Sequence, residues 1–144
     1  MKIVLQRVNT ASVKVEGAVV GQIGPGYVVL LGIGAEDTKA DIDRVVEKIK
    51  KLRLFPDEAG KTNRSISDIN GELLVVSQFT LYADCRKGNR PSFTSAAAPD
   101  IAEALYDYFI EAAKPHFANV AHGRFGAYMQ VELVNDGPFT VILE

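Results

Sequence analysis

The sequence predicts an α+β fold, in which a largely antiparallel, barrel-like sheet carries two helices packed outside it. Apolar segments of strand length, alternating or continuous, recur at 1–8, 11–16, 18–23, 27–33, 72–84, 128–134 and 139–143. Only two segments, 37–53 and one that starts near Pro99, carry apolar residues at helical spacing. The last third of the chain returns to strands, so strands outnumber helices throughout.

The predicted strands differ in their patterns. In 11–16, Val13 and Val15 point to one face and polar side chains to the other. The segment 27–33 is apolar without interruption, so we expect it to be buried on both faces. The first helix has its apolar stripe at Ile42, Val45, Val46, Ile49 and Leu52. The second begins near Pro99, because proline suits a first helical turn, and ends at Pro115.

Length and composition predict a single domain over residues 1–144 with a sizeable core. Hydrophobic residues make up 47% of the chain and charged residues 24%, which is typical of globular proteins. One cysteine excludes an internal disulfide. The sequence contains no signal peptide and no apolar stretch long enough to cross a membrane, so we expect a cytoplasmic protein without a membrane partner.

Several common chemistries are absent from the sequence. It contains no GxxxxGK[ST], GxGxxG, CxxC or HExxH motif. Two histidines, His116 and His122, are too few for a histidine-rich metal site. We therefore expect no cofactor and no metal. Cys85, beside Arg86 and Lys87, is a conceivable nucleophile, but an ordinary loop cysteine is the simpler interpretation.

The first candidate site lies at the end of the strand predicted over 72–84. Leu73 to Val76 are apolar on both faces, and polar residues then follow on both faces, with Ser77 on one and Gln78 and Thr80 on the other. A buried strand that becomes polar at its carboxyl end is typical of a strand that enters a site, although many strands become polar simply on reaching the surface.

The second candidate site is Asn135-Asp136-Gly137-Pro138-Phe139-Thr140. Asp-Gly between two alternating segments predicts a hairpin turn. A Gly-Pro bond can be cis in a tight turn. The pair Gly137-Pro138 in that form would present bare backbone carbonyls as a rigid edge, able to sense the shape of a small ligand.

The two segments together resemble the motif pair of the D-aminoacyl-tRNA deacylase family: a Ser-Gln-x-Thr strand end and an Asn-x-Gly-Pro-x-Thr turn. Shorter matches run along nearly the whole chain, and their order makes the resemblance specific. They are Gln6-Arg7-Val8, Gly60-Lys61-Thr62-Asn63, Cys85-Arg86-Lys87-Gly88, Arg90-Pro91-Ser92-Phe93 and Gly123-Arg124-Phe125-Gly126-Ala127. Two positions depart from the family pattern, Thr62, where methionine is common, and Tyr128, where aspartate is common.

The resemblance implies a homodimer with its sites at the subunit interface, tRNA as partner, and hydrolysis of D-aminoacyl and glycyl esters of tRNA. It implies a catalytic pocket formed by Ser77, Gln78, Phe79 and Thr80. It also implies that Gly137 and Pro138 reach in from the other subunit and exclude L side chains. Phe125 and Met129 are the residues implied to lie near the terminal adenosine.

The overall charge of -2 does not indicate an RNA-binding protein, so the tRNA contacts must come from a local patch. We expect Arg86, Lys87 and Arg90 to contact phosphates, because they follow the proposed pocket directly. Two alternatives remain open. One is a non-catalytic module that binds the 3′ end of tRNA. The other is a serine or cysteine hydrolase of small esters that depends on Cys85, His116 or His122.

Overall fold

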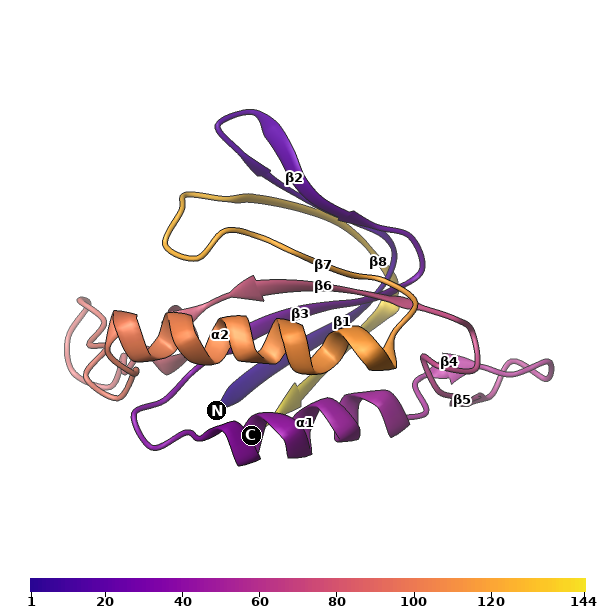
Figure 1. Ribbon diagram of the computed structural model, residues 1–144, viewed down its shortest axis with the longest axis horizontal. Helices are drawn as coiled ribbons and strands as arrows, with labels where there is room; N and C mark the ends of the chain where they lie inside the picture. The colour runs from indigo at the N-terminus through magenta and orange to yellow at the C-terminus, as the bar shows by residue number, and fades with distance from the viewer.

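The computed structural model describes residues 1–144 and has an α+β architecture with a nearly closed sheet. The helices α1 and α2 lie side by side over one face of the sheet (Figure 1). No helix is long and apolar enough to span a bilayer. The helices and main strands are β1 (Lys2–Val15), β2 (Ala18–Ile23), β3 (Gly26–Gly32), α1 (Lys39–Lys51), β6 (Glu72–Ser77), α2 (Pro99–Ala113), β7 (Val120–His122) and β8 (Gln130–Leu143).

The sheet is mixed, so the prediction of a largely antiparallel sheet is wrong. Strand β1 pairs antiparallel with β2, β3 and β8, but β3 and β6 run parallel, as do β6 and β7. The cause lies in the helices. Helix α1 connects β3 to β6 and α2 connects β6 to β7, and a helix between two neighbouring strands returns the chain so that the second strand runs parallel to the first.

Several element boundaries differ from the predicted ones. The segments predicted at 1–8 and 11–16 form one strand, β1, of 14 residues. Strand β6 ends at Ser77, and a short 3-10 helix, η1 (Phe79–Tyr82), replaces the rest of the predicted strand. The predicted loop 55–70 contains a small hairpin of β4 (Phe55–Pro56) and β5 (Thr62–Arg64), and η2 (Lys114–His116) follows α2.

Asn135 to Pro138 form no hairpin, because β8 keeps its direction through them. Both halves of β8 pair with β1, and the register passes from Gln6↔Thr140 to Val8↔Asn135. The three extra residues on the β8 side therefore bulge out of the ladder. The peptide bond between Gly137 and Pro138 in this bulge is cis.

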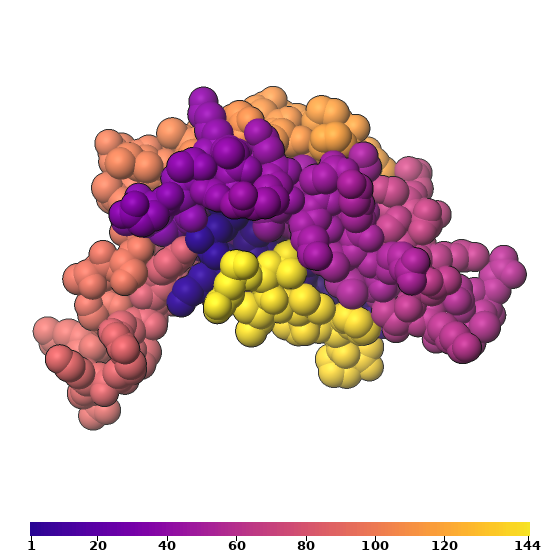
Figure 2. Space-filling view, turned by 90° about the horizontal axis from the view of Figure 1, so that it is seen from below, coloured from indigo at the N-terminus to yellow at the C-terminus, as the bar shows by residue number.

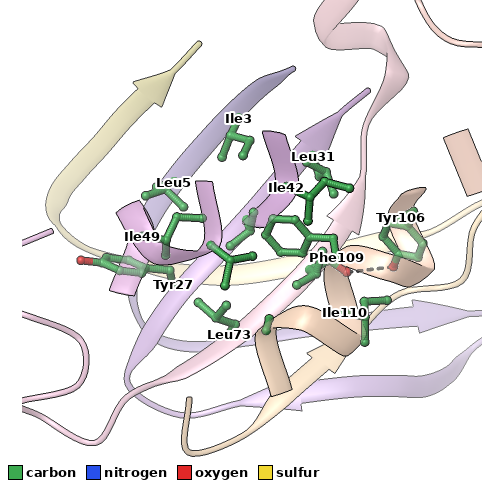
Figure 3. Packing of buried hydrophobic residues seen from close by; sticks show 14 of the residues in the cluster. Ile3, Leu5, Tyr27, Leu31, Ile42, Ile49, Leu73, Tyr106, Phe109 and Ile110 are labelled. Atoms are coloured by element: carbon green, nitrogen blue, oxygen red, sulfur yellow. Dashed lines mark hydrogen bonds between the residues drawn. The ribbon is translucent and has the colours of Figure 1, made fainter. Parts of the chain in front are cut away.

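The core has two parts, one on each face of the sheet. The larger fills the space between the sheet and the helices, where Tyr27, Ile49 and Phe109 are fully buried (Figure 3). The continuous burial predicted for 27–33 is confirmed, since β3 is almost wholly buried. The smaller part lies where the sheet curls over its other face, and consists of Val8, Ala11, Val13, Ile23, Val28, Leu74 and Val76.

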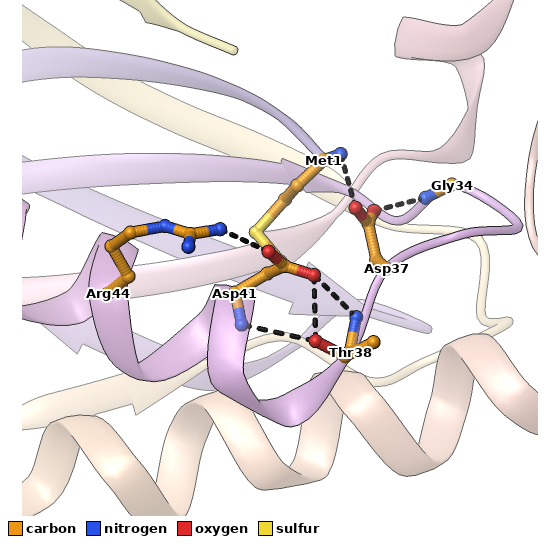
Figure 4. A network of polar contacts seen from close by, with 6 residues as sticks. All are labelled: Met1, Gly34, Asp37, Thr38, Asp41 and Arg44. Atoms are coloured by element: carbon orange, nitrogen blue, oxygen red, sulfur yellow. Dashed lines mark hydrogen bonds and ion pairs between the residues drawn. The ribbon is translucent and has the colours of Figure 1, made fainter.

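Polar contacts fix the start of α1 against the ends of β1 and β3 (Figure 4). Thr38 caps the helix, and the Asp41 carboxylate accepts hydrogen bonds from the Thr38 backbone N–H at 2.9 Å and the Thr38 hydroxyl at 2.8 Å. The Asp37 carboxylate accepts from the Gly34 N–H and from the Met1 amino group, both at 2.6 Å. Figure 2 shows the first residues of β1 and the end of β8 lying side by side next to α1.

Candidate functional site

A cavity of about 480 Å³ opens where the parallel strands β3 and β6 end. The carboxyl ends of parallel strands are a common place for ligands in α/β proteins. The Gln78 N–H donates to the Leu31 carbonyl at 2.8 Å, which holds the start of η1 against the end of β3. The lining residues are Leu31, Ile33, Ser77, Gln78, Phe79, Phe93, Ala96, Ala97, Ala98, Pro99, Ala102, Phe125 and Gly126.

None of these lining residues is ionisable. Ser77 and Gln78 supply the polar side chains, and the remaining walls are apolar or backbone. A mostly apolar cavity with a few placed polar groups is how small-molecule sites are generally built. A reaction in such a cavity would depend on positioning and on hydrogen bonds from neutral groups.

The four residues predicted as catalytic lie together, but only three of them line the cavity. Ser77, Gln78 and Phe79 line the cavity, whereas Thr80 is exposed beside it and accepts a hydrogen bond from the Gln78 amide. Phe79 is 57% exposed, and its ring packs edge-on against Phe93 with centroids 5.1 Å apart. The backbone N–H groups of Phe79 and Thr80 precede the first hydrogen bond of η1, from the Leu81 N–H to the Gln78 carbonyl, so they have no partner inside this helix.

The two residues predicted near the adenosine are separated. Phe125 lines the cavity and packs against Tyr106 with ring centroids 5.8 Å apart. Met129 lies instead against Gly123, packed on the smaller part of the core, and supports the 123–129 loop from behind. The structure therefore places Phe125 with Ser77, Gln78 and Phe79, but not Met129.

Gly137 and Pro138 are exposed and lie away from this cavity in the same chain. Their bulge is on β8, separated from β6 by β1 and β3, at ~4.8 Å between neighbouring strands. Arg7 braces the bulge: its Nε donates to the Asp136 carbonyl at 2.9 Å, and its guanidinium lies 4.6 Å above the Phe139 ring. A Cβ added to Gly137 would lie 2.8 Å from the Phe139 nitrogen.

The basic residues predicted to contact phosphates are all exposed in the loop between η1 and α2. Arg86 is engaged with Asp84 through two hydrogen bonds of 2.8 and 2.7 Å, and these bonds hold the pKa of Asp84 below its usual value. Lys87 and Arg90 form no ion pair. Of the three, these two have free charges.

The residues of the competing hydrolase hypothesis do not line the cavity. Cys85 is exposed in the loop beyond η1, and neither His116 nor His122 is among the lining residues. No group of three or more His, Cys, Asp and Glu side chains is arranged to hold a metal ion. A larger cavity of about 880 Å³, between α1 and the end of β8, contains none of the predicted site residues.

The sequence did not predict the opposite wall of the cavity. Phe93 and the alanines at 96–98 approach the end of β3 because the Ala97 N–H donates to the Ile33 carbonyl at 3.0 Å. Phe93 belongs to one of the short family matches, but the motif itself indicates no role. The run of small residues before Pro99 was the only other signal, since alanines allow a loop to approach a strand closely.

Comparisons with known proteins show the family of the chain. The family model described as D-Tyr-tRNA(Tyr) deacylase matches residues 4–144. A D-aminoacyl-tRNA deacylase of Thermosipho africanus is 58% identical over 144 residues, covering 100% of this chain and 97% of the relative. One from Bacillus cereus (strain G9842) is 54% identical over 100% of this chain and 99% of the relative.

Two solved structures have the same fold. One, described as a c-Myc DNA unwinding element binding protein, superposes with a TM-score of 0.94 at 46% identity, covering 100% of this chain and 98% of that chain. The other, described as a probable eukaryotic D-amino acid tRNA deacylase, superposes with a TM-score of 0.87 at 17% identity, covering 99% and 97%. At that identity the second likeness concerns the fold alone.

The full-length matches define an enzyme of the hydrolase class. The chain belongs to the D-Tyr-tRNA(Tyr) deacylase family. The family and the enzyme class predicted from the two sequence motifs are thereby confirmed.

Proposed function

We propose that the protein hydrolyses the ester joining a D-amino acid, or glycine, to the 3′ end of tRNA and rejects the L-aminoacyl ester. The observation that carries the proposal is the cavity at the end of β6, where Ser77, Gln78, Phe79 and Phe125 meet. Membership of the deacylase family over the whole chain supports the substrate class. A tRNA substrate also fits the cytoplasmic location expected from the sequence.

Hydrolysis requires stabilisation of the charge that develops on the ester carbonyl oxygen. The N–H groups of Phe79 and Thr80, at the start of η1, are suited to donate to this oxygen, with the Gln78 amide as a further donor. One such donor contributes roughly 3–4 kcal/mol to the transition state. Water adds to the carbonyl carbon, the bond to the ribose oxygen breaks, and that oxygen takes the proton, which leaves a free amino acid and tRNA.

Water is activated by the substrate in this proposal. The vicinal ribose 2′-hydroxyl lies next to the ester, and it accepts a proton from the attacking water while it passes its own proton to the departing ribose oxygen, so the protein needs no base of its own. Thr80 is less suited to act as a covalent nucleophile, because its hydroxyl accepts from Gln78 and no base lies among the residues of the cavity. An aminoacyl ester is already activated, so positioning supplies much of the remaining rate.

Chiral selection is assigned to Gly137-Pro138 of a second copy of the chain. The pair is exposed, braced by Arg7 and remote from the cavity of its own chain, which suits a group that acts on a neighbour. A D and an L residue differ by exchange of the side chain and the hydrogen on Cα. A rigid wall on the L side therefore rejects every L side chain and admits glycine.

The rest of the tRNA end is assigned to residues around the cavity. Phe125 is placed to stack on the terminal adenosine, since its ring forms part of the wall. Met129 would act indirectly, by supporting the loop that carries Phe125. Lys87 and Arg90 have free charges for phosphates, whereas Arg86 must first release Asp84.

The test compares release of tyrosine from D-tyrosyl-tRNA and L-tyrosyl-tRNA, with glycyl-tRNA as a third substrate. We expect fast hydrolysis of the D and glycyl esters and none of the L ester beyond the spontaneous rate. Equal hydrolysis of the D and L esters would overturn the chiral wall. Hydrolysis of none of the three would overturn the proposed activity and favour a module that only binds tRNA.

A further inference from the structure

A second cavity, of about 330 Å³, adjoins the first. Phe125 belongs to the walls of both, so the two cavities meet at this residue. The second cavity lies between α2 and the chain that leaves β7. Nothing in the proposed hydrolysis uses it.

Unpaired charges surround this second cavity. Glu103 and Asp107 reach it from α2, and Arg124 from the loop after β7, and none of the three forms an ion pair. Exposed carboxylates and a guanidinium that share one cavity without pairing remain available to a ligand that needs both signs of charge.

The floor of the cavity is fixed. The buried Tyr106 hydroxyl donates to the Val75 carbonyl at 3.1 Å and lies 3.4 Å from the Gly123 carbonyl. His122 Nδ1 lies 2.6 Å from the same Gly123 carbonyl. Because a carbonyl oxygen only accepts, Nδ1 carries the proton, and the other edge of the imidazole is left free. The charged groups thus stand on a preorganised backbone.

We propose that this cavity binds the nucleotide that precedes the terminal adenosine of tRNA, a cytidine. The inference rests on the proposed function. Arg124 would hold the phosphate between the two nucleotides, because a guanidinium matches a phosphate in shape and charge. Glu103 and Asp107 would accept from the exocyclic amino group of cytosine, which carboxylates recognise.

The position of Phe125 supports the order of the two nucleotides. Successive bases of a single strand commonly stack on protein aromatic rings. With the adenosine in the first cavity, the preceding base reaches the second by passing the same ring. The two carboxylates would repel a phosphate, so they suit a base edge. Uridine has a carbonyl oxygen where cytidine has the amino group, so the cavity should reject it.

The experiment uses three small substrates, the D-tyrosyl esters of adenosine, of the dinucleotide CpA and of the dinucleotide UpA. We expect kcat/KM for the CpA ester to exceed that for the UpA ester by about tenfold, as for one good base contact. In Arg124→Gln, the advantage of CpA over adenosine should fall while the adenosine ester reacts at the wild-type rate. In Glu103→Ala/Asp107→Ala, the preference for CpA over UpA should disappear.

Matched controls are Arg44→Gln on α1 and Glu111→Ala at the far end of α2, both exposed and outside the two cavities. Both should leave the three rates unchanged. Equal wild-type kcat/KM for CpA and UpA would overturn the inference, as would variants that slow the adenosine ester as much as the CpA ester. Inactivity of the wild type on all three esters and on D-tyrosyl-tRNA would instead overturn the proposed function.

Binding of the unesterified dinucleotides gives a readout independent of hydrolysis. Calorimetric titration of the wild type should give a lower Kd for CpA than for UpA, and Glu103→Ala/Asp107→Ala should equalise the two. Equal wild-type values would count against the cytidine site even if the enzyme were active.

Discussion

At the scale of single residues, Gln78 and Thr80 act as a pair. The Gln78 amide donates to the Thr80 hydroxyl, so each side chain limits the orientations of the other. Because the amide is already fixed in this way, it loses little further conformational entropy when the substrate binds. The role proposed for Thr80 is therefore to hold Gln78, which differs from nucleophilic attack in a measurable way.

Replacing Thr80 distinguishes these roles. Thr80→Val should lower kcat by about 10²-fold, as expected for loss of an oriented donor. Loss of a nucleophile costs on the order of 10⁶-fold. Single-turnover hydrolysis of D-tyrosyl-tRNA gives the rate, and mass spectrometry of the quenched enzyme would detect an acyl adduct. Thr94→Val, an exposed threonine outside the cavity, is the control; an adduct on Thr80 would contradict our assignment.

Gly137 provides the second test at this scale. A Cβ there would lie 2.8 Å from the Phe139 nitrogen, and the φ of +146° is one that L side chains rarely adopt. Gly137→Ala should therefore displace the wall and reduce the ratio of D to L ester hydrolysis by at least tenfold. Gly60→Ala, with φ of +78° but no atom within 4 Å of its added Cβ, is the matched control. An unchanged ratio in Gly137→Ala would exclude this wall.

Sequence patterns predicted part of the site at this scale. The change from apolar to polar residues at Ser77 located the cavity, and the family match added Phe125. Phe93 could not be placed, because it comes near η1 only through the fold of a loop that lacks any periodic pattern. Met129 is not among the lining residues of the cavity, and its place near the adenosine stays a prediction, since alternation gives the face of a residue but not the neighbour behind that face.

At the scale of elements, the start of α1 depends on Thr38. Its hydroxyl caps the helix and its backbone N–H donates to Asp41. Thr38→Ala should reduce the free energy of unfolding by about 1 kcal/mol, the usual cost of a lost N-cap. Urea unfolding followed by circular dichroism measures it. Thr62→Ala, at an exposed site outside any helix, should change it little; equal losses would contradict the capping role.

The same cap predicts a dependence on pH. Hydrogen bonds from Thr38, and then the charge of Arg44, hold the pKa of Asp41 below its ordinary value of 3.8. A lowered carboxyl pKa means that Asp41 stabilises the fold above pH 3.8 and that this contribution is lost as the pH falls through the folded pKa. The Tm of Asp41→Ala should lie below that of the wild type at pH 7, and the two should converge in acid. A constant difference would contradict the assignment.

Elements were predicted better than their pairing. The burial of β3 followed from an unbroken apolar segment, and both helices from their stripes. The directions of the strands could not be predicted from the sequence pattern, because the periodicity is the same in parallel and antiparallel strands. The bulge in β8 resembled a hairpin in sequence, since Asp-Gly is common in both. Only the continued pairing with β1 distinguishes the two.

At the scale of the whole molecule, β8 is unlike the other long strands. It has 14 residues and none of them is buried, while Val134 and Ile142 are exposed apolar side chains. Its other edge pairs with no strand, because β1 is its only partner in the sheet. An exposed, partly apolar edge strand normally needs a covering partner. The second copy of the chain that we propose, bringing Gly137-Pro138 to the cavity, would meet that need.

Mixing two variants tests this arrangement. Gln78→Ala removes the donor and should be nearly inactive, whereas Gly137→Ala alters the wall and should hydrolyse the L ester as well. If each site combines Gln78 of one copy with Gly137 of the other, a mixed dimer has one intact, selective site and one site with both changes. An equal mixture, unfolded and refolded, should then hydrolyse the L ester at about a quarter of the rate of Gly137→Ala alone, and its ratio of D to L hydrolysis should double. Each variant refolded alone is the control, and an unchanged ratio in the mixture would contradict a shared site.

The absence of ionisable groups from the cavity also affects how the rate should depend on pH. Burial, with a smaller effect of Asp37, raises the pKa of Tyr82 to about 12, so even the residue that ends η1 stays neutral in ordinary buffers. The hydrolysis proposed for this cavity uses no acid or base from its lining. The dependence of its rate on pH should then follow the ionisation of the α-amino group of the aminoacyl ester. Lengthening or substituting that amine should shift the profile along the pH axis. Changing the pocket residues should change only the height of the profile.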